Sequence, residues 1–408
     1  MNKPALTLVG LAATTVAAGL LALGVMPSPF LAKASPAASI SANSDWRWNL
    51  PQGFPEPLVP TDNPMSEAKF QLGRHLFFDT RLSGNGSMGC GSCHFQNLAF
   101  TDGKAVATGS TGDLTTRGAM SIANVAYYPT LTWANPSQYT LEIQAGVPMF
   151  VENLAVELGI NDENKATVLA RFQNDADYQR RFKEAFPGEP INYLNIIKAI
   201  AAFERGVISG NSRFDQAQAG TVTLTDTEER GRKLFFSEQA QCSSCHSGFN
   251  FSDQTVSAAS PQSNQPFHNT GLYNVDGQGA YPDSNPGVIG VLPQQASNMG
   301  KFRVPSLRNI EVTAPYMHDG TLANLQDVLA FYAAGGRNIT SGPNQGDGRK
   351  NPFKDARLDK IRLNTDEQAD LIAFLKTLTD QAFLNNPRFA DPFKTTSPSA
   401  QQSLASNH

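Results

Sequence analysis

The residues of this chain best suited to chemistry form two copies of the pattern Cys-x-x-Cys-His. They are CGSCH at residues 90–94 and CSSCH at residues 242–246, and together they contain all four cysteines. Residues three apart lie on one face of a helical turn, so the two thiols of each copy can form thioethers with the vinyl groups of one haem. The histidine that follows can bind the iron as an axial ligand. The sequence therefore predicts two covalently bound haem c groups, haem 1 on Cys90, Cys93 and His94, and haem 2 on Cys242, Cys245 and His246.

Two other uses of four cysteines fit this pattern less well. A disulfide framework is typical of short secreted chains, whereas 408 residues can bury a large core without covalent links. A four-cysteine zinc site needs its two pairs about 15–20 residues apart, and here the pairs lie in different halves of the chain. Covalent haem attachment is the better interpretation.

The second axial ligand of each iron decides what that haem can do. An iron with a free position can react with a small molecule, and an iron with two protein ligands mainly transfers electrons. No histidine lies between His94 and His246, and the only methionines in that interval are Met120 and Met149. We therefore expect haem 1 to be open, while His75, which precedes the first pattern, is expected to pack on its own helix.

Haem 2 has few methionines within reach of its pattern. A simple cytochrome c uses a methionine some way downstream as the second ligand of its iron. After His246 the chain contains only Met299 and Met317. The residues by themselves leave the second ligand of haem 2 open.

An internal repeat indicates which elements position the two haem sites. The sequence Gly-Arg-x-Leu-Phe-Phe begins at Gly73 and again at Gly231, each time shortly before a Cys-x-x-Cys-His pattern. This repeat predicts two cytochrome-c-like helical domains with one haem each, at residues 45–220 and 221–385. The fold class is expected to be mainly α with long loops, as in residues 256–300, and with a short strand or two.

Several individual helices are also expected. Thr225 and Glu228 form a capping-box pattern at a helix start. Apolar residues recur with helical spacing over residues 193–208. Thr365 and Gln368 are predicted to begin another helix, with an apolar stripe that packs into the core.

The two ends of the chain differ from the rest in composition. Residues 1–34 contain Lys3, a long apolar stretch and a final Ala-Lys-Ala, which is the layout of a secretory signal peptide cleaved after Ala34. The length of the apolar stretch also allows an uncleaved membrane anchor. Residues 386–408 are rich in Ser, Asn, Gln and Pro and are predicted to be disordered.

Five motifs along the chain resemble those of a known family. They are GRHLFFDTRLS at 73–83, FTDG at 100–103, FERGVISGNSRFD at 203–215, FRVPSLRNI at 302–310 and TAPYMHDG at 313–320. Their sequence and order resemble those of the bacterial di-haem cytochrome c peroxidase and MauG superfamily over about residues 48–385. The resemblance implies an enzyme with two haem c groups, exported to the periplasm.

The resemblance also implies ligands for both haems. In ordinary di-haem peroxidases a methionine fourteen residues after the histidine of the Pro-Tyr-x-His-Asp-Gly motif binds haem 2; counting from His318, this chain has Tyr332, as the MauG branch does. A phenolate is a hard anionic ligand that favours oxidised iron. Ordinary members often close haem 1 at rest with a histidine sixteen residues after the first pattern, where this chain has Ser110.

Further positions of the family carry over to the first half of the chain. Trp133 corresponds to the tryptophan that lies between the two haems and relays electrons. Gln144 and Pro148 have the family spacing, and Glu157 corresponds to the distal acid–base residue. Because the interval from Pro148 to Glu157 is three residues longer than usual, Glu152 is the alternative acid–base residue. These features most resemble the MbnH-like group, relatives of MauG that oxidise tryptophan in a partner protein.

The family also places calcium between its domains, with carbonyl groups that correspond to Thr313 and Pro315. An asparagine fifteen residues before the tryptophan completes that site in the family, and here this position is Gly118, which has no side-chain oxygen. Calcium is therefore doubtful unless Asn124 or water replaces the ligand. Arg308 is expected either to meet a haem propionate or to form a structural ion pair.

Three functions are compatible with these residues. The leading hypothesis is an exported enzyme that reacts with hydrogen peroxide at haem 1, shares the oxidising equivalents with a His/Tyr-ligated haem 2, and oxidises an aromatic residue of an exported protein substrate. The first alternative is a conventional peroxidase that takes electrons from a small cytochrome or cupredoxin. The second is a non-catalytic electron carrier with Met149 closing haem 1. No nucleic-acid partner is expected, because 17% charged residues and a net charge of −4 give no basic face.

Overall fold

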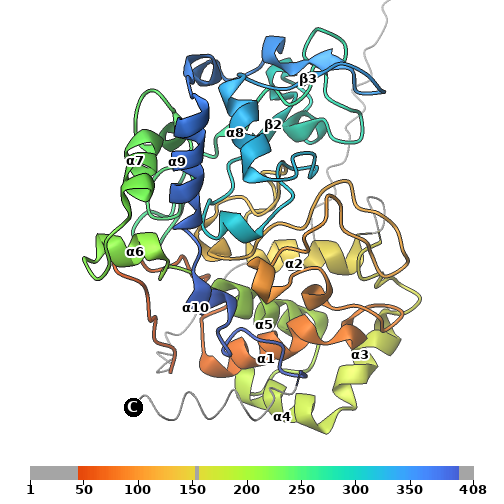
Figure 1. The fold of residues 1–408 in the computed structure, drawn as a ribbon. Helices are drawn as coiled ribbons and strands as arrows, with labels where there is room; N and C mark the ends of the chain where they lie inside the picture. Colours follow the sequence, from red (N-terminus) through yellow and green to blue (C-terminus); the bar gives the residue numbers. More distant parts are fainter. Residues whose placement is uncertain (1–44, 152–155, 395–408) are drawn as a thin grey trace, which may run out of the picture. The chain divides into compact units, whose positions relative to one another are not determined.

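The computed structural model describes residues 45–151 and 156–394. The predicted signal peptide, residues 1–34, lies outside the described residues. No helix of the described residues is both long and apolar enough to cross a membrane. The fold is mainly helical with little strand, which confirms the predicted fold class (Figure 1).

The helices and strands are short and are joined by long loops. The helices are α1 (Glu67–Phe78), α2 (Leu141–Phe150), α3 (Lys165–Gln173), α4 (Ala176–Ala185), α5 (Tyr193–Arg205), α6 (Arg213–Gln218), α7 (Asp226–Phe235), α8 (Leu325–Ala333), α9 (Thr365–Lys376) and α10 (Gln381–Leu384). The strands form two antiparallel pairs, β1 (Phe267–Asn269) with β2 (Lys301–Arg303), and β3 (Asn338–Ile339) with β4 (Gly346–Asp347).

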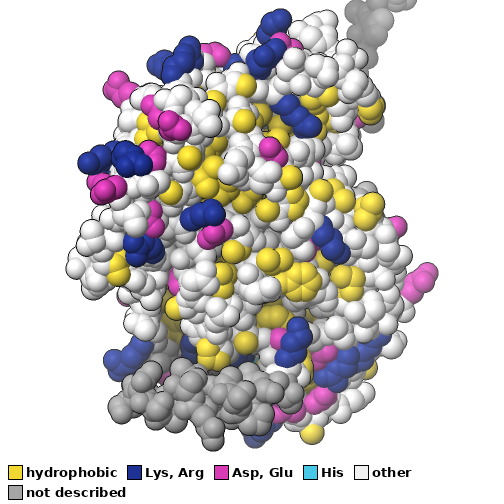
Figure 2. Space-filling view, viewed as in Figure 1, with side chains coloured by type: hydrophobic (Ala, Val, Ile, Leu, Met, Phe, Trp, Pro, Cys, Tyr) yellow, Lys and Arg dark blue, Asp and Glu magenta, His cyan; other side chains and the backbone are white. Residues whose placement is uncertain are grey.

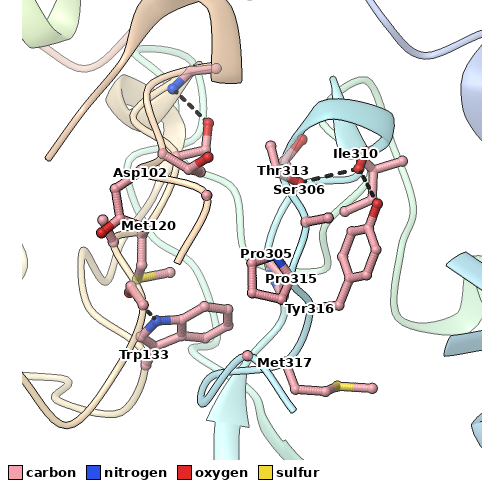
Figure 3. Close-up of a pocket in the computed structure, with 18 of the residues that line it drawn as sticks. Asp102, Met120, Trp133, Pro305, Ser306, Ile310, Thr313, Pro315, Tyr316 and Met317 are labelled. Carbon is pink, nitrogen blue, oxygen red and sulfur yellow. Dashed lines mark hydrogen bonds between the residues drawn. The ribbon is translucent and has the colours of Figure 1, made fainter. Parts of the chain in front are cut away.

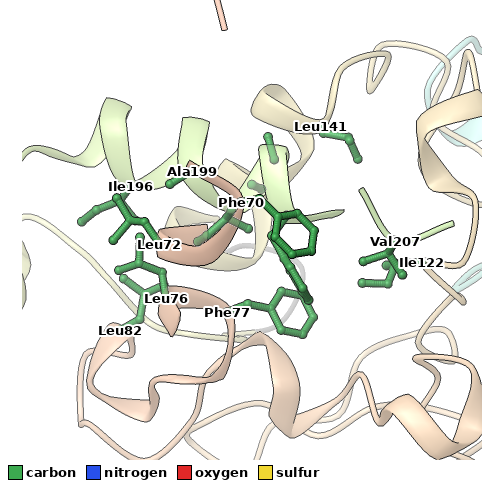
Figure 4. Close-up of a cluster of buried hydrophobic side chains, with 14 of the residues drawn as sticks. Phe70, Leu72, Leu76, Phe77, Leu82, Ile122, Leu141, Ile196, Ala199 and Val207 are labelled. Carbon is green, nitrogen blue, oxygen red and sulfur yellow. The ribbon is translucent and has the colours of Figure 1, made fainter. Parts of the chain in front are cut away.

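Buried apolar side chains form two clusters. The first, drawn in part in Figure 4, contains Phe70 and Phe77 of α1 together with side chains of α2 to α5. The second contains side chains of α7, α8 and α9. Phe383 of α10 and Phe389 belong to the first cluster although they follow the second in sequence, so the C-terminal end of the described chain returns to the first half. The predicted domain division at residues 220 and 221 stays a prediction.

Each cluster contains a close helix crossing at the repeated glycine. A Cβ atom on Gly73 of α1 would lie 1.9 Å from the carbonyl oxygen of Ala199 in α5 and 2.9 Å from Cβ of Phe203. A Cβ atom on Gly231 of α7 would lie 1.9 Å from the carbonyl oxygen of Asp370 in α9. Only glycine allows backbones to approach this closely. The repeat found in the sequence is therefore a repeated helix-packing device.

The structure tests three predictions about where helices begin and end. The capping box of Thr225 with Glu228 is confirmed at the start of α7. The cap of α9 is Asn364, whose side chain accepts from the backbone N–H of Glu367, so the predicted start at Thr365 and Gln368 was one residue late because asparagine is the stronger cap. The helix predicted over residues 193–208 ends at Arg205.

The predicted disordered tail also needs correction. Phe389 is buried, and the guanidinium of Arg388 pairs with Glu67 of α1 at 2.6 Å. Residues 386–394 are therefore packed against the first half. Their polar composition was misleading because a few anchoring side chains are enough to hold a short segment. The rest of the tail, residues 395–408, lies outside the described residues.

Candidate haem and relay sites

The two cysteine patterns adopt the same local structure. Cys90–Ser92 and Cys242–Ser244 each form one 3₁₀ turn, and the backbone N–H of each following histidine donates to the first cysteine's carbonyl oxygen, at 3.1 Å for His94 and 2.9 Å for His246. No disulfide joins the four cysteines, and each is of intermediate exposure. A turn of this kind places both thiols and the imidazole on one side of the backbone, as covalent haem attachment requires.

Both histidines are held in the orientation that an iron ligand needs. Nδ1 of His94 lies 2.6 Å from the carbonyl oxygen of Phe100, and Nδ1 of His246 lies 3.1 Å from that of Phe251. If Nδ1 carries the proton, Nε2 is left as the free lone pair for the iron. Burial lowers the pKa of both imidazoles, which favours the neutral form that binds metal.

The two acceptors, Phe100 and Phe251, were missed in the sequence. Both have left-handed backbones, with φ of 62° and 50°, an uncommon conformation for a bulky residue. The conformation turns each carbonyl oxygen toward its histidine. The signal was present, because Phe100-Thr-Asp and Phe251-Ser-Asp stand at similar distances after the two patterns and extend the internal repeat.

A large cavity adjoins His246, and we call it the His246 cavity. It encloses about 1410 Å³ of space, including its open mouth. Cys242, Cys245 and Tyr332 of α8 also line it. Burial raises the pKa of the Tyr332 phenol above its ordinary value, and the two thiols add to this effect. The structure thus brings Tyr332 to the haem 2 pattern across about ninety residues of sequence.

Some of the other residues that could bind the haem 2 iron also line the His246 cavity. Met317 and His318 line the His246 cavity, whereas Met299 does not. His268 lines it too, but both ring nitrogens are engaged, Nε2 by Asp253 at 2.7 Å and Nδ1 by Asp355 at 3.0 Å. His268 is therefore fixed by carboxylates and does not point a free nitrogen into the cavity.

A second cavity, the Asp102 cavity, lies beside the first and shares Trp133 with it. Asp102, Met120 and Trp133 line one side, and the Pro305 to Met317 segment lines the other (Figure 3). Trp133 lines both cavities. Its indole Nε1 donates to the carbonyl oxygen of Gly118 at 3.3 Å. Trp133, the predicted relay residue, therefore borders both the Asp102 cavity and the His246 cavity.

Of the expected distal residues of haem 1, Glu157 lies near the first cysteine pattern. Burial raises the pKa of Glu157, and its charge in turn acts on Cys90 and Cys93. The backbone N–H of Ser110 donates to the carbonyl oxygen of Glu157 at 2.8 Å. Gln144 is half-buried on α2. Glu157 is thus near the thiols of Cys90 and Cys93.

The other residues considered for haem 1, as iron ligands or as the acid–base residue, lie in different places. Met149 is buried at 1% exposure within the first apolar cluster. Met120 lines the Asp102 cavity, and its sulfur accepts from Nη2 of Arg303 at 3.6 Å. Glu152 lies outside the described residues. His75 packs on its own helix as expected, with Nδ1 2.7 Å from the carbonyl oxygen of Gln71.

The residues expected at a calcium site do come together. Thr313, Pro315 and Gly118 all line the Asp102 cavity, where Oδ2 of the buried Asp102 has no hydrogen-bond partner. Asn124 does not join them, because its side chain bonds the backbone of Ser209 on both sides. These carbonyls and one carboxylate are suitable oxygen ligands for Ca²⁺, and calcium stays a prediction.

Arg308 forms the structural ion pair that was one of its two expected roles. Its two terminal nitrogens bond Asp215 at 2.8 and 3.0 Å, and its Nε bonds the carbonyl oxygen of Phe249. Its donors are therefore largely satisfied by protein.

Two buried residues with unsatisfied donors were missed by the sequence. Arg303 has no partner for Nε or Nη1, and His318 has none for Nε2. Both line the His246 cavity. Burial of orphaned polar atoms is costly, so these atoms indicate that the cavity holds a polar group. Thiols, imidazoles and orphaned donors around one large apolar space together fit a haem c.

The chain is similar to known di-haem proteins. Residues 67–223 match the family described as di-haem cytochrome c peroxidase. Cytochrome-c peroxidase IdrP1 of Denitromonas iodatirespirans is 35% identical, covering 79% of this chain and 84% of the relative. Methylamine utilization protein MauG of Methylophilus methylotrophus is 31% identical, covering 83% and 91%. A crystal structure of a MauG-like protein associated with microbial copper homeostasis is 53% identical with a TM-score of 0.84, covering 86% of this chain and all of the other.

Proposed function

The chain belongs to the di-haem cytochrome c peroxidase and MauG family of haem-containing oxidoreductases, and on that basis we propose that it is an exported periplasmic enzyme that uses hydrogen peroxide to oxidise an aromatic side chain of a partner protein. The observation that carries this proposal is Tyr332 facing the His246 cavity, at the position where ordinary family members have a methionine. The MauG-like structure at 53% identity supports the same branch of the family.

The chemistry divides between the haems and a few side chains. When bound, the two haem c groups supply the redox centres for peroxide reduction and for storage of two oxidising equivalents. Glu157 accepts a proton from one peroxide oxygen and delivers it to the other, which leaves as water. Burial raises the pKa of Glu157. The raised pKa helps its carboxyl group first to accept the proton and then to release it.

Tyr332 and Trp133 have their roles at haem 2 and between the two cavities. Tyr332, as a phenolate, stabilises oxidised iron. Trp133 provides an aromatic ring between the two cavities. Two electrons and two protons from the partner protein balance the reduction of one hydrogen peroxide to two waters. Ser110 offers no imidazole to close haem 1 at rest.

A conventional peroxidase is the second candidate, because cytochrome-c peroxidase IdrP1 is 35% identical over most of its length. In that case a small cytochrome or cupredoxin supplies the two electrons. The open resting state of haem 1 separates the two proposals. A MauG-type enzyme reacts with peroxide when fully oxidised, and a conventional enzyme with a closed haem 1 first needs one electron.

The deciding experiment is rapid mixing of the fully oxidised protein with one equivalent of hydrogen peroxide, while both haem spectra are followed. We expect an immediate change in both spectra. In Trp133→Phe we expect the haem 1 change to persist and the haem 2 change to slow, whereas Trp48→Phe, a half-buried tryptophan near the start of the described chain, serves as the matched control. No reaction until partial reduction would overturn the proposal and favour the conventional peroxidase.

A further inference from the structure

Arg303 carries a buried guanidinium that the described protein does not satisfy. The residue is 4% exposed, and neither Nε nor Nη1 has a hydrogen-bond partner. Nη2 donates to the sulfur of Met120, a weak acceptor, at 3.6 Å. Within residues 45–151 and 156–394, no carboxylate forms an ion pair with Arg303. A guanidinium remains charged in proteins, so this is a buried positive charge with two free donors.

The surroundings of Arg303 compensate for only part of this charge. The guanidinium lies over the ring of Tyr128, 3.8 Å from its centroid, and a cation over an aromatic face is stabilised. This attraction is weaker than the loss of hydration for an unpaired buried ion. The other buried arginine of the same segment, Arg308, shows the usual solution, because Asp215 binds it through two bonds. Arg303 therefore lacks an anion among the residues that the structure describes.

The position of Arg303 identifies where that anion lies. Arg303 ends β2 and lines both the His246 cavity and the Asp102 cavity. His318 lines the His246 cavity as well and is 4% exposed. Its Nε2 has no hydrogen-bond partner and lies 3.9 Å from Oδ2 of Asp319. Its ring stacks on Phe302 with centroids 3.7 Å apart, which fixes its direction. A neutral imidazole can donate one hydrogen bond, and Arg303 can donate two.

We propose that Arg303, assisted by His318, binds a propionate carboxylate of the haem in the His246 cavity and so holds that haem against Trp133. A carboxylate matches the planar fork of a guanidinium, which explains why arginine rather than lysine occupies the site. The backbone N–H of Arg303 donates to the carbonyl oxygen of Trp133 at 2.8 Å. One residue thus connects the anionic edge of haem 2 to the relay. Arg303 is a positioning residue in this proposal, which rests on haem 2 being bound and not on the identity of the oxidised substrate.

The test uses the haem-loaded protein without peroxide, so failure of the proposed peroxide reaction does not affect it. Arg303→Gln, Arg303→Lys and Arg308→Gln are compared with the wild type by redox titration of both haems and by redox-difference infrared spectroscopy of the propionate carboxylates. Arg308→Gln is the matched control, because it removes an equally buried guanidinium whose anion is Asp215.

In Arg303→Gln we expect a shifted propionate band and a lower reduction potential for haem 2, because loss of a nearby positive charge favours the oxidised iron. In Arg303→Lys the charge is kept and the fork is lost, so the band shifts and the potential stays close to that of the wild type. Arg308→Gln leaves the propionate band unchanged. An unchanged band in Arg303→Lys, or the same band shift in Arg308→Gln, overturns the proposal even if Arg303→Gln does not load haem.

Discussion

The backbone N–H of Arg303 donates to the carbonyl oxygen of Trp133 at 2.8 Å, and this bond joins the predicted relay to the strand that follows the second haem pattern. Trp133 is held a second time through Gly118, whose carbonyl oxygen accepts from the indole and whose N–H donates to the carbonyl oxygen of His318 at 3.3 Å. In both hydrogen bonds of Trp133 the partner is a backbone group, the N–H of Arg303 or the carbonyl oxygen of Gly118. The orientation of the indole between the two cavities therefore depends on the fold and not on neighbouring side chains alone.

Replacement of Glu157 by Gln should slow the reaction of the oxidised protein with hydrogen peroxide by about 10²–10⁴-fold, the usual contribution of a general acid–base group. Rapid-mixing rates measure this effect. Glu163→Gln, which changes an exposed glutamate nearby, should react at the wild-type rate. Equal rates in both variants would exclude Glu157 as the proton carrier and direct attention to Glu152.

The same group should set the acid limit of the rate. Burial raises the pKa of Glu157, and proton acceptance requires the carboxylate. The wild-type rate should therefore fall on acidification at a higher pH than an ordinary glutamate would give, and Glu157→Gln should lack this fall.

Replacement of Tyr332 by Phe or Met should change the spectrum of haem 2 and raise its reduction potential, because the anionic ligand that stabilises oxidised iron is lost. Methionine should raise the potential further, since a thioether favours reduced iron. Absorption spectroscopy and redox titration measure both effects. Tyr139→Phe, at a tyrosine 58% exposed, is the control. An unchanged haem 2 would instead assign the ligand to Met317 or His318, which line the same cavity.

Alanine at Gly73 or at Gly231 should destabilise the protein by about 1–3 kcal/mol each, the usual cost of overpacking. The added Cβ would lie 1.9 Å from a carbonyl oxygen of the crossing helix at both sites. Alanine at Gly146 of α2, where the nearest atom is 4.0 Å away, should stabilise by about 0.5–1 kcal/mol. Denaturant unfolding followed by circular dichroism measures the three values, and equal effects at Gly73 and Gly146 would contradict the close crossing.

Glu204 of α5 should make the protein less stable as the pH rises. Burial raises its pKa from 4.5 to about 8, so between these values the folded state binds more protons than the unfolded state, and the free energy of unfolding falls by at most about 1.4 kcal/mol per pH unit. The contribution of Glu204 to the free energy of unfolding is fully present below pH 4.5 and is lost as the pH rises to about 8. Glu204→Gln should remove this slope, and Glu238→Gln, an exposed glutamate, should keep it. A slope that persists in Glu204→Gln would assign it to other groups.

The sequence determined the two haem-attachment turns, because each depends on five consecutive residues and is therefore local. It also determined the helical repeat, since Gly-Arg-x-Leu-Phe-Phe occurs twice and packs twice in the same way, with Gly73 against Ala199 and Gly231 against Asp370. The position of Tyr332 came from resemblance rather than from periodicity. Its register became visible only because a motif with fixed spacing precedes it.

Other features depended on contacts between distant segments. Nothing local distinguishes Arg303 from Arg308, yet Asp215 pairs with one and leaves the other unpaired. The return of Phe389 to the first cluster was hidden by a polar composition, because side-chain burial is a property of the packed chain. Trp133 read alone is an ordinary core tryptophan; only the tertiary structure places it on the walls of two cavities at once. Short-range patterns fix backbone turns and helices, and the partners of buried charges and rings are chosen when distant segments pack.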